Sequence, residues 1–211
     1  MYRSHVLVCG GTGCTYSHSG ELIEALEKNI KEKENILNQD FTTTSINQKW
    51  SADITYIHTE KDGWTYLASV EDLYSRKIIG WAFGKTMDAE LAKKALKNAS
   101  LNIKKTKGII LQTDLGSQYT SNIFEEYLAE LKIRHSYSRK GCPYDNSCIE
   151  SFHSILKKEE VNLKKYKDFK EAYNAIFEFI EAWYNRERIH SCLNYKTPDE
   201  VHSEDEESFA A

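Results

Sequence analysis

Three carboxylates, Asp53, Asp114 and Glu150, constrain the fold of this chain because each lies in a distinct structural pattern. Residues 50–57 alternate as in a half-buried strand, with Trp50, Ala52, Ile54 and Tyr56 on the buried face, so Asp53 is expected on the opposite face. Asp114 ends an apolar run and precedes a turn that leads into a helix, which places it at the carboxyl end of a strand. Glu150 lies one turn into a helix that is expected to begin at 145–147. The pattern predicts that the three carboxylates converge.

A cluster of carboxylates repels itself unless cations neutralise it. Oxygen ligands without a thiolate favour Mg²⁺ or Mn²⁺ over zinc. Two such ions, about 3.5 to 4 Å apart, can activate an attacking oxygen and stabilise the leaving oxygen of a phosphodiester. Asp53, Asp114 and Glu150 are therefore the candidate catalytic residues and metal ligands of a phosphoryl-transfer site. The alternative interpretation is three solvated surface acids, which the surrounding patterns disfavour.

The order of the expected elements indicates an α/β fold. The expected strands are 54–57, 66–70, 78–83, one at Ile109 and 133–136, and the expected helices are 88–99, 123–131 and one carrying Glu150. Three strands followed by alternating helices and strands are typical of an α/β domain. A further long helix is expected at about 169–188. Its apolar stripe is expected to pack in the core rather than to stack on bases, and consists of Tyr173, Ile176, Phe177, Ile180 and Trp183.

The charge distribution allows a DNA partner although the whole chain is acidic. The formal net charge is −4, yet residues 41–198 hold 24 Lys and Arg against 20 Asp and Glu. Residues 199–211 contain six Asp and Glu and no Lys or Arg, and are expected to form a frayed tail. The remaining region is mildly basic, so it can offset phosphate charge.

Basic side chains near the proposed site are the candidate DNA contacts. Lys157 is the strongest of them, because it shares a helical stripe with Glu150. For Arg188, a structural role near the end of the long helix is at least as well supported. For the lysines at residues 164–167, a solvated helix face is favoured over contact with DNA. The candidate DNA-binding residues are Lys157, His153, Arg139, Lys140, Lys158 and Arg188.

Length and composition favour one main globular domain without extended linkers. The longest apolar run is far shorter than a membrane span, and no secretory signal precedes it. We therefore expect a cytoplasmic, nucleoid-associated protein with no membrane partner. Five cysteines, an odd number, indicate reduced thiols.

A series of short motifs follows one another in a fixed order along most of the chain. They include Trp50-Ser-Ala-Asp-Ile-Thr-Tyr56, Tyr66-Leu-Ala68, Gly80-Trp81, Thr113-Asp-Leu-Gly-Ser-Gln-Tyr-Thr-Ser121, Tyr144-Asp-Asn146, Glu150-Ser-Phe152 and Tyr184-Asn-Arg-Glu-Arg-Ile-His190. Through these motifs, residues 35–201 resemble the catalytic region of DDE insertion-sequence transposases of the OrfB type, which share the retroviral-integrase core.

The resemblance implies an RNase H-like fold, with a mixed sheet flanked by helices, that cuts and joins DNA with two Mg²⁺ ions. It also implies that Asp53, Asp114 and Glu150 are the metal ligands. The expected chemistry is hydrolysis that frees a 3′-hydroxyl at the element's end, followed by attack of that hydroxyl on another phosphodiester. The expected partners are DNA, as element ends and target, and further copies of the chain, with no small-molecule substrate.

The chain also departs from the family pattern. The helix-turn-helix region that usually precedes the core is not recognised in residues 1–34, which leaves recognition of the element ends open. Gln112 and Thr113 stand where the family commonly has His-Ser, and Cys142 and Cys148 stand where small or polar residues are usual. The alternative function is a truncated, non-catalytic product that binds DNA or a full-length transposase.

Residues 1–34 follow a different pattern, with a short strand that runs into a glycine-rich turn. This segment resembles the start of the thioredoxin-like [2Fe-2S] module of NADH-dehydrogenase and hydrogenase subunits, where Cys9 and Cys14 would be the first two ligands. The second pair is missing, so an iron–sulfur redox fragment is the least favoured alternative. The expected organisation is a foreign fragment at 1–34, a catalytic core at 35–201 and an acidic tail at 202–211.

Overall fold

The computed structural model describes residues 33–101, 103 and 106–210. Contacts divide the chain into two units, Met1–Glu34 and Asn35–Ala211. The glycine-rich start with Cys9 and Cys14 lies outside the described residues, so the foreign fragment expected there stays a prediction. The helices and strands of the described chain belong to the second unit.

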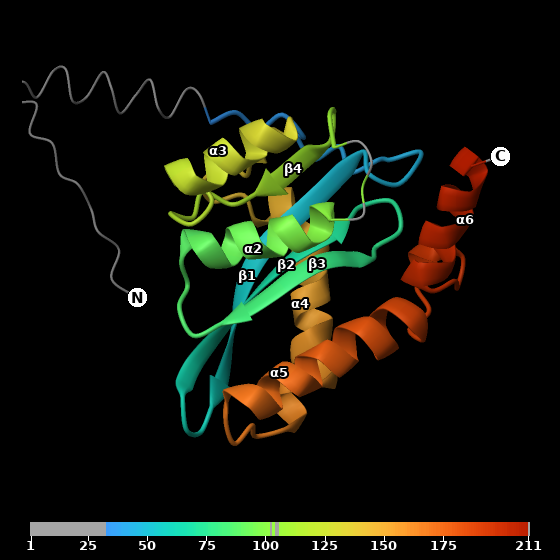
Figure 1. The fold of residues 1–211 in the computed structure, drawn as a ribbon. Helices are drawn as coiled ribbons and strands as arrows, with labels where there is room; N and C mark the ends of the chain where they lie inside the picture. Colours follow the sequence, from blue (N-terminus) through green and yellow to red (C-terminus); the bar gives the residue numbers. More distant parts are fainter. Residues whose placement is uncertain (1–32, 102, 104–105, 211) are drawn as a thin grey trace, which may run out of the picture. The chain divides into compact units, whose positions relative to one another are not determined.

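A five-stranded mixed sheet forms the centre of the second unit (Figure 1). Its strands, in the order β3-β2-β1-β4-β5, are β3 (Ile78–Gly84), β2 (Gly63–Asp72), β1 (Lys49–Thr59), β4 (Ile110–Thr113) and β5 (Arg134–Tyr137). The first three strands pair antiparallel in sequence order, whereas β4 pairs parallel with both β1 and β5. The expected strands are all present, and the first two are longer than their apolar cores indicated.

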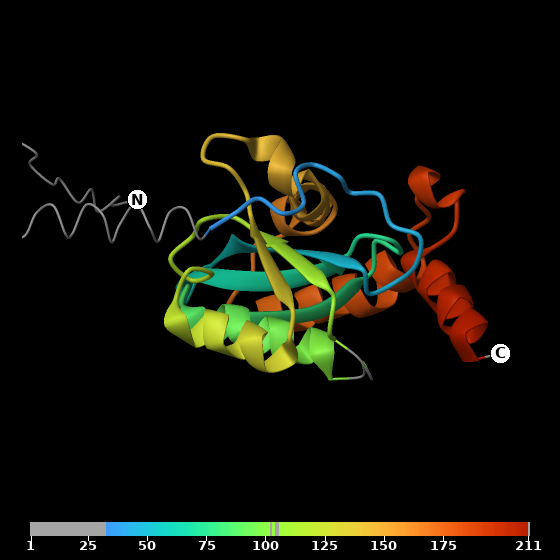
Figure 2. The ribbon, with the colours of Figure 1, turned by 90° about the horizontal axis from the view of Figure 1, so that it is seen from above.

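Helices cover both faces of the sheet. Figure 2 shows α4 on one side and α2 and α3 on the other. The helices are α2 (Ala89–Ser100), α3 (Asn122–Leu131), α4 (Ser147–Glu159) and α5 (Phe169–Glu178), and α5 continues as a π-helical segment, Phe179–Tyr184. Two buried apolar clusters result, one between the sheet and α2 and α3, the other between the sheet and α4 and α5. Most of the apolar burial that stabilises this unit lies in these two layers.

The alternation of β1 places Asp53 on the face that α4 covers. Trp50 and Ala52 are buried in the cluster with α2 and α3, as the pattern predicted, and Asp53 points to the other face. β4 pairs with β1 at Lys49, Trp50 and Ser51. From Ala52 to His58, the β4 side of β1 has no strand neighbour among the described residues. Asp53 therefore lies just beyond the point where the pairing of β1 with β4 ends.

The acid-rich C-terminal segment corrects an expectation. Residues expected to fray form the helix α6 (Pro198–Ala210). His202 is buried and its Nδ1 atom lies 3.0 Å from Ser75 Oγ, while Asp205 accepts a hydrogen bond from the backbone N–H of Ile46. Local composition predicted the wrong state because long-range contacts and the ion pair of Asp199 with Lys77 hold the helix.

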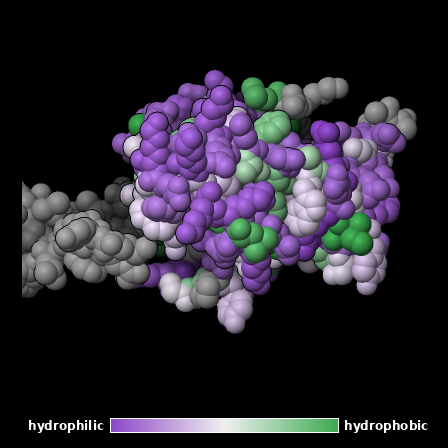
Figure 3. All heavy atoms as spheres, turned by 90° about the horizontal axis from the view of Figure 1, so that it is seen from below, coloured by the Kyte–Doolittle hydropathy of each residue, from purple (hydrophilic) through white to green (hydrophobic). Residues whose placement is uncertain are grey.

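The aromatic stripe of the long helix is only partly core. Ile176 and Ile180 are fully buried, as expected. Tyr173 is 40% exposed and Phe177 is 50% exposed, and both rings contact Trp81 from one side. The face in Figure 3 is mostly hydrophilic, with apolar side chains in small separate groups. A membrane-spanning helix would need a longer apolar stretch than any helix of the described chain provides.

Candidate active site

Asp53 is held by a histidine from α4. The Nδ1 atom of His153 lies 3.4 Å from Oδ2 of Asp53, and its Nε2 atom lies 2.9 Å from Oγ of Ser69. Asp53 and Ser69 face each other across β1 and β2, so one buried histidine contacts both members of a cross-strand pair. The position of the helix relative to the sheet is thereby coupled to the position of the Asp53 carboxylate.

Asp114 directly follows the last residue of β4, as the sequence predicted. Its Oδ1 atom accepts a hydrogen bond of 2.9 Å from the backbone N–H of Gly116. A Cβ at Gly116 would lie 2.9 Å from the same oxygen and 2.7 Å from Oε1 of Gln118, so a side chain there would have to displace these two side-chain atoms. Partial desolvation by neighbouring atoms raises the pKa of the Asp114 carboxyl group. The hydrogen bond from Gly116 lowers this pKa, and repulsion from Asp53 raises it further.

Glu150 lies in the first turn of α4 and lines the same hollow as Asp53. Desolvation raises the pKa of Glu150, and repulsion from Asp53 raises it further, whereas His153 opposes the rise. Asp53, Glu150 and His153 line one open hollow of about 520 Å³. Repulsion from Asp53 thus contributes to the raised pKa of both Asp114 and Glu150.

Tyr119 is a member of this site that the sequence patterns did not reveal. The residue is fully buried, and its hydroxyl has no hydrogen-bond partner among the described residues. Burial raises the pKa of Tyr119 well above its usual value, and repulsion from Asp53 and Asp114 adds to the rise. An unsatisfied buried hydroxyl close to two carboxylates is expected at a site that binds a further polar group. Tyr119 lies in a turn, where sequence periodicity carries no signal for burial.

The donor chemistry of Asp53, Asp114 and Glu150 fits a hard divalent cation. All three supply carboxylate oxygens, and like charges close together need a positive ion to relieve their repulsion. Within the described parts of the chain, no three His, Cys, Asp or Glu side chains lie close enough to form a complete metal site. Asp53 therefore influences the pKa of both other carboxyl groups, but the three carboxylates are not close enough together in this structure to surround one ion.

The expected DNA contacts separate into two groups. His153, Lys157 and Lys158 line the hollow that also contains Asp53 and Glu150. His153 is nevertheless buried, so the contacts it makes here are with protein side chains. Lys157 and Lys158 lie on the same helix as Glu150; Lys157 is half-buried and Lys158 is exposed.

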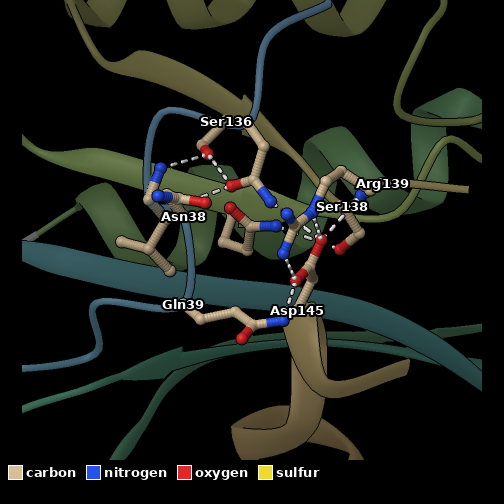
Figure 4. A network of polar contacts seen from close by, with 9 residues as sticks. Asn38, Gln39, Ser136, Ser138, Arg139 and Asp145 are labelled. Atoms are coloured by element: carbon tan, nitrogen blue, oxygen red, sulfur yellow. Dashed lines mark hydrogen bonds and ion pairs between the residues drawn. The ribbon is translucent and has the colours of Figure 1, made fainter. Parts of the chain in front are cut away.

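The remaining candidates make structural contacts or lie in the loop before α4. Arg139 forms an ion pair with Asp145 that Figure 4 shows within a larger polar network, and its neighbour Lys140 is exposed. The Nη1 atom of Arg188 lies 3.1 Å from Nε2 of His190, and its guanidinium lies 5.9 Å from the ring centre of Trp183. The structural role weighed for Arg188 fits these contacts, and its contact with DNA stays a prediction.

Two family models cover almost the whole described core. Both describe an integrase core domain, and they match residues 43–143 and 131–198. The solved structures that resemble this chain include the HTLV-2 integrase catalytic core domain in complex with magnesium, with a TM-score of 0.57 at 18% identity over 76% of this chain and 99% of that one. The catalytic core domain of BIV integrase gives a TM-score of 0.56 at 17% identity, over 78% and 99% of the respective chains. The fold is thus the RNase H-like integrase core that was expected.

Curated relatives identify the family within this class. The transposase of insertion sequence IS904 from Lactococcus lactis is 42% identical over 78% of this chain and 64% of its own length. The transposase InsF of IS3A from Escherichia coli is 42% identical over 79% of this chain and 58% of its own length. InsF of IS3fB from Escherichia coli is 37% identical over 94% of this chain and 68% of its own length, an alignment that extends into residues 1–34. The chain belongs to the InsF-type transposases of IS3-like insertion sequences, and it spans 58–64% of the first two relatives.

Proposed function

We propose that this chain is the catalytic part of a metal-dependent transposase that cleaves DNA and joins the freed strand to a second site. The observation that carries the proposal is that Asp53 and Glu150 line one open hollow; repulsion from Asp53 also contributes to the raised pKa of both Asp114 and Glu150. Asp53 lies on β1, Asp114 directly follows β4 and Glu150 lies in the first turn of α4, so three separate elements supply the proposed ligands. The magnesium complex of the HTLV-2 integrase core supports Mg²⁺ as the ion.

Each residue has a definite part in this proposal. Asp53, Asp114 and Glu150 would hold the ions, which when bound would activate the attacking oxygen and stabilise the leaving oxygen. His153 orients the carboxylate of Asp53 through its 3.4 Å contact. Partners of metal ligands commonly fix ligand geometry in this way. In the first reaction water breaks a phosphodiester and leaves a 3′-hydroxyl; in the second that hydroxyl attacks another phosphodiester and displaces a new 3′-oxygen.

DNA is the proposed partner, as element end and as target. Lys157 and Lys158 lie beside the carboxylates and can neutralise phosphates on the strand that enters the site. Their charges offset the local repulsion between DNA and the acidic cluster. We also expect several copies of the chain to act together on paired DNA ends, in the cytoplasm, since joining two DNA sites requires that both be held at once.

Cleavage of labelled DNA tests the proposed function. The substrate is a duplex that carries the ends flanking this element, incubated with the full chain in Mg²⁺ or in EDTA. We expect Mg²⁺-dependent nicked and joined products, and their loss in Asp114→Asn. The matched control is Glu130→Gln, an exposed carboxylate on α3. Folded wild-type protein that yields no product would favour a non-catalytic chain, and full activity of Asp114→Asn would remove the proposed ligand.

A further inference from the structure

A second hollow continues from the carboxylate site along the open side of β1. Its volume is about 540 Å³, within the range of about 300–1,000 Å³ typical of ligand pockets. Tyr56, Lys157 and Asn162 line both this hollow and the one that contains Asp53. A chain of nucleotides that passes the carboxylates can therefore reach the second hollow without leaving the surface.

Exposed aromatic side chains form the sheet side of this hollow. Tyr56 on β1 is 53% exposed, and Trp64 at the start of β2 is 55% exposed. Their ring centres lie 5.1 Å apart with the ring planes nearly perpendicular, and His58 contacts Trp64 in a similar way. The sequence alternation predicted Tyr56 on the buried face. The strand extends beyond the helices that cover that face, so the ring meets solvent instead.

Lysines form the opposite side of the hollow. Lys157 Nζ lies 4.3 Å from the centre of the Tyr56 ring, a cation–π contact that links α4 to β1. Lys164 and Lys165 follow from the segment after α4, and Lys164 pairs with Glu160. Against these three lysines, one acidic residue, Glu60, lines the same hollow. The net charge of the lining is therefore positive.

Exposed aromatic rings interleaved with lysines match the chemistry of an unpaired nucleotide. A base that has left the duplex stack presents an apolar face that can stack on an exposed aromatic ring. The adjoining phosphates need cations within reach. A paired base keeps its faces inside the duplex and gains no contact with such rings. An apolar protein partner would leave the lysines without a counter-charge.

We propose that the aromatic hollow, defined by Tyr56, His58, Trp64, Lys157 and Lys165, binds an unpaired nucleotide of the DNA strand whose phosphodiester lies at the carboxylates. The inference deepens the proposed function and rests on it for the identity of the strand. Stacking on Trp64 or Tyr56 holds a frayed end open, and Lys157 and Lys165 contact its phosphates. Single-stranded ends would then bind more tightly than blunt ends of the same sequence.

Fluorescence anisotropy in EDTA tests this binding without any cleavage. The probes are a labelled duplex with a short unpaired overhang and the blunt duplex of the same sequence, each titrated with the full chain. We expect wild type to prefer the overhang. We expect Trp64→Ala to weaken overhang binding by about 5- to 150-fold with little effect on the blunt duplex. Trp64→Phe should retain most of the preference.

Two controls separate stacking from loss of structure. Tyr195→Ala removes an exposed ring elsewhere on the unit and should leave the preference unchanged. Tyr56→Ala provides a second variant with the expected loss if Trp64→Ala fails to fold by circular dichroism. An equal preference for the overhang in wild type and in the folded aromatic variants would overturn the proposal.

The outcomes also distinguish this inference from the proposed function. A Trp64-dependent overhang preference in a wild-type chain that makes no Mg²⁺-dependent product would keep the binding site and refute the catalytic role. If wild type shows Mg²⁺-dependent cleavage but Trp64→Ala has the same overhang preference as wild type, the catalytic role is kept and the binding site is refuted.

Discussion

His153 contacts Asp53 and, through its other ring nitrogen, Ser69 on the neighbouring strand. These two contacts join α4, which carries Glu150, to β1, which carries Asp53, and to β2, which carries Ser69. Apolar packing and the hydrogen bond from Ser51 to Asn146, the residue before α4, also hold the helix to the sheet, but neither contacts the Asp53 carboxylate. We infer that His153 sets the orientation of Asp53 relative to Glu150.

His153→Ala should lower Mg²⁺-dependent cleavage by about 10- to 100-fold, the usual effect of losing a partner of a metal ligand. Ser69→Ala removes only the contact between Ser69 and His153, so it should lower the cleavage rate less. The measurement is the cleavage rate at several Mg²⁺ concentrations, with urea unfolding of each variant. Full cleavage activity in folded His153→Ala would show that Asp53 needs no such support.

Gly80 is required by the close approach of β3 to α2. A Cβ there would lie 2.3 Å from the backbone nitrogen of Ala99 and 2.6 Å from the carbonyl oxygen of Ala95. Gly80→Ala should therefore lower the free energy of unfolding by about 2–3 kcal/mol. Gly84→Ala is the control, because its near neighbour is the end of the flexible Leu91 side chain. Equal urea midpoints for Gly80→Ala and wild type would contradict this packing.

Asp145 anchors the segment before α4. It is 1% exposed and accepts hydrogen bonds from Asn35, Gln39 and the backbone and side chain of Arg139 (Figure 4). The side-chain hydrogen bond from Arg139 is the largest of the causes that lower the pKa of Asp145 to about 2. The pKa is lower in the folded state, so this contribution is present above about pH 4 and is lost as the pH falls toward 2.

Asp145→Asn should lower the free energy of unfolding by about 1–2 kcal/mol at pH 7, because it removes the ion pair with Arg139. The loss is limited because solvent screens the half-exposed Arg139 side chain. The difference from wild type should shrink as the pH falls from about 4 to 2. Urea unfolding at pH 7, 4 and 3 measures both effects. A difference that stays constant over this range would assign the cost to lost geometry rather than to charge.

His202 fixes the C-terminal helix to the turn between β2 and β3. Its buried ring lies 3.0 Å from Ser75 Oγ. His202→Ala should destabilise the unit by about 1–2 kcal/mol, since it removes a partner from a buried hydroxyl. Ser203→Ala changes an exposed neighbour on α6 and should be neutral. Hydrogen exchange of the α6 amides would show whether the helix loosens in His202→Ala alone; unchanged protection would contradict this anchoring.

Sequence patterns predicted the parts of this molecule that local periodicity encodes. The alternation around Trp50 placed Asp53 on the correct face, and the turn after Asp114 placed that residue at a strand end. The burial of Tyr119 and the docking of α6 onto Ile46 depend on contacts between distant parts of the chain, which composition does not reveal. Tyr56 shows the same limit, because alternation does not indicate where the covering helices end.

The central claim is that Asp53, Asp114 and Glu150, from three separate elements, act as one metal site. Mn²⁺ binding followed by electron paramagnetic resonance tests it on the full chain without DNA. We expect wild type and the control Glu130→Gln to bind Mn²⁺ alike, and each of Asp53→Asn, Asp114→Asn and Glu150→Gln to lose at least one bound ion or weaken its binding. Unchanged Mn²⁺ binding in all three folded variants would contradict a shared site.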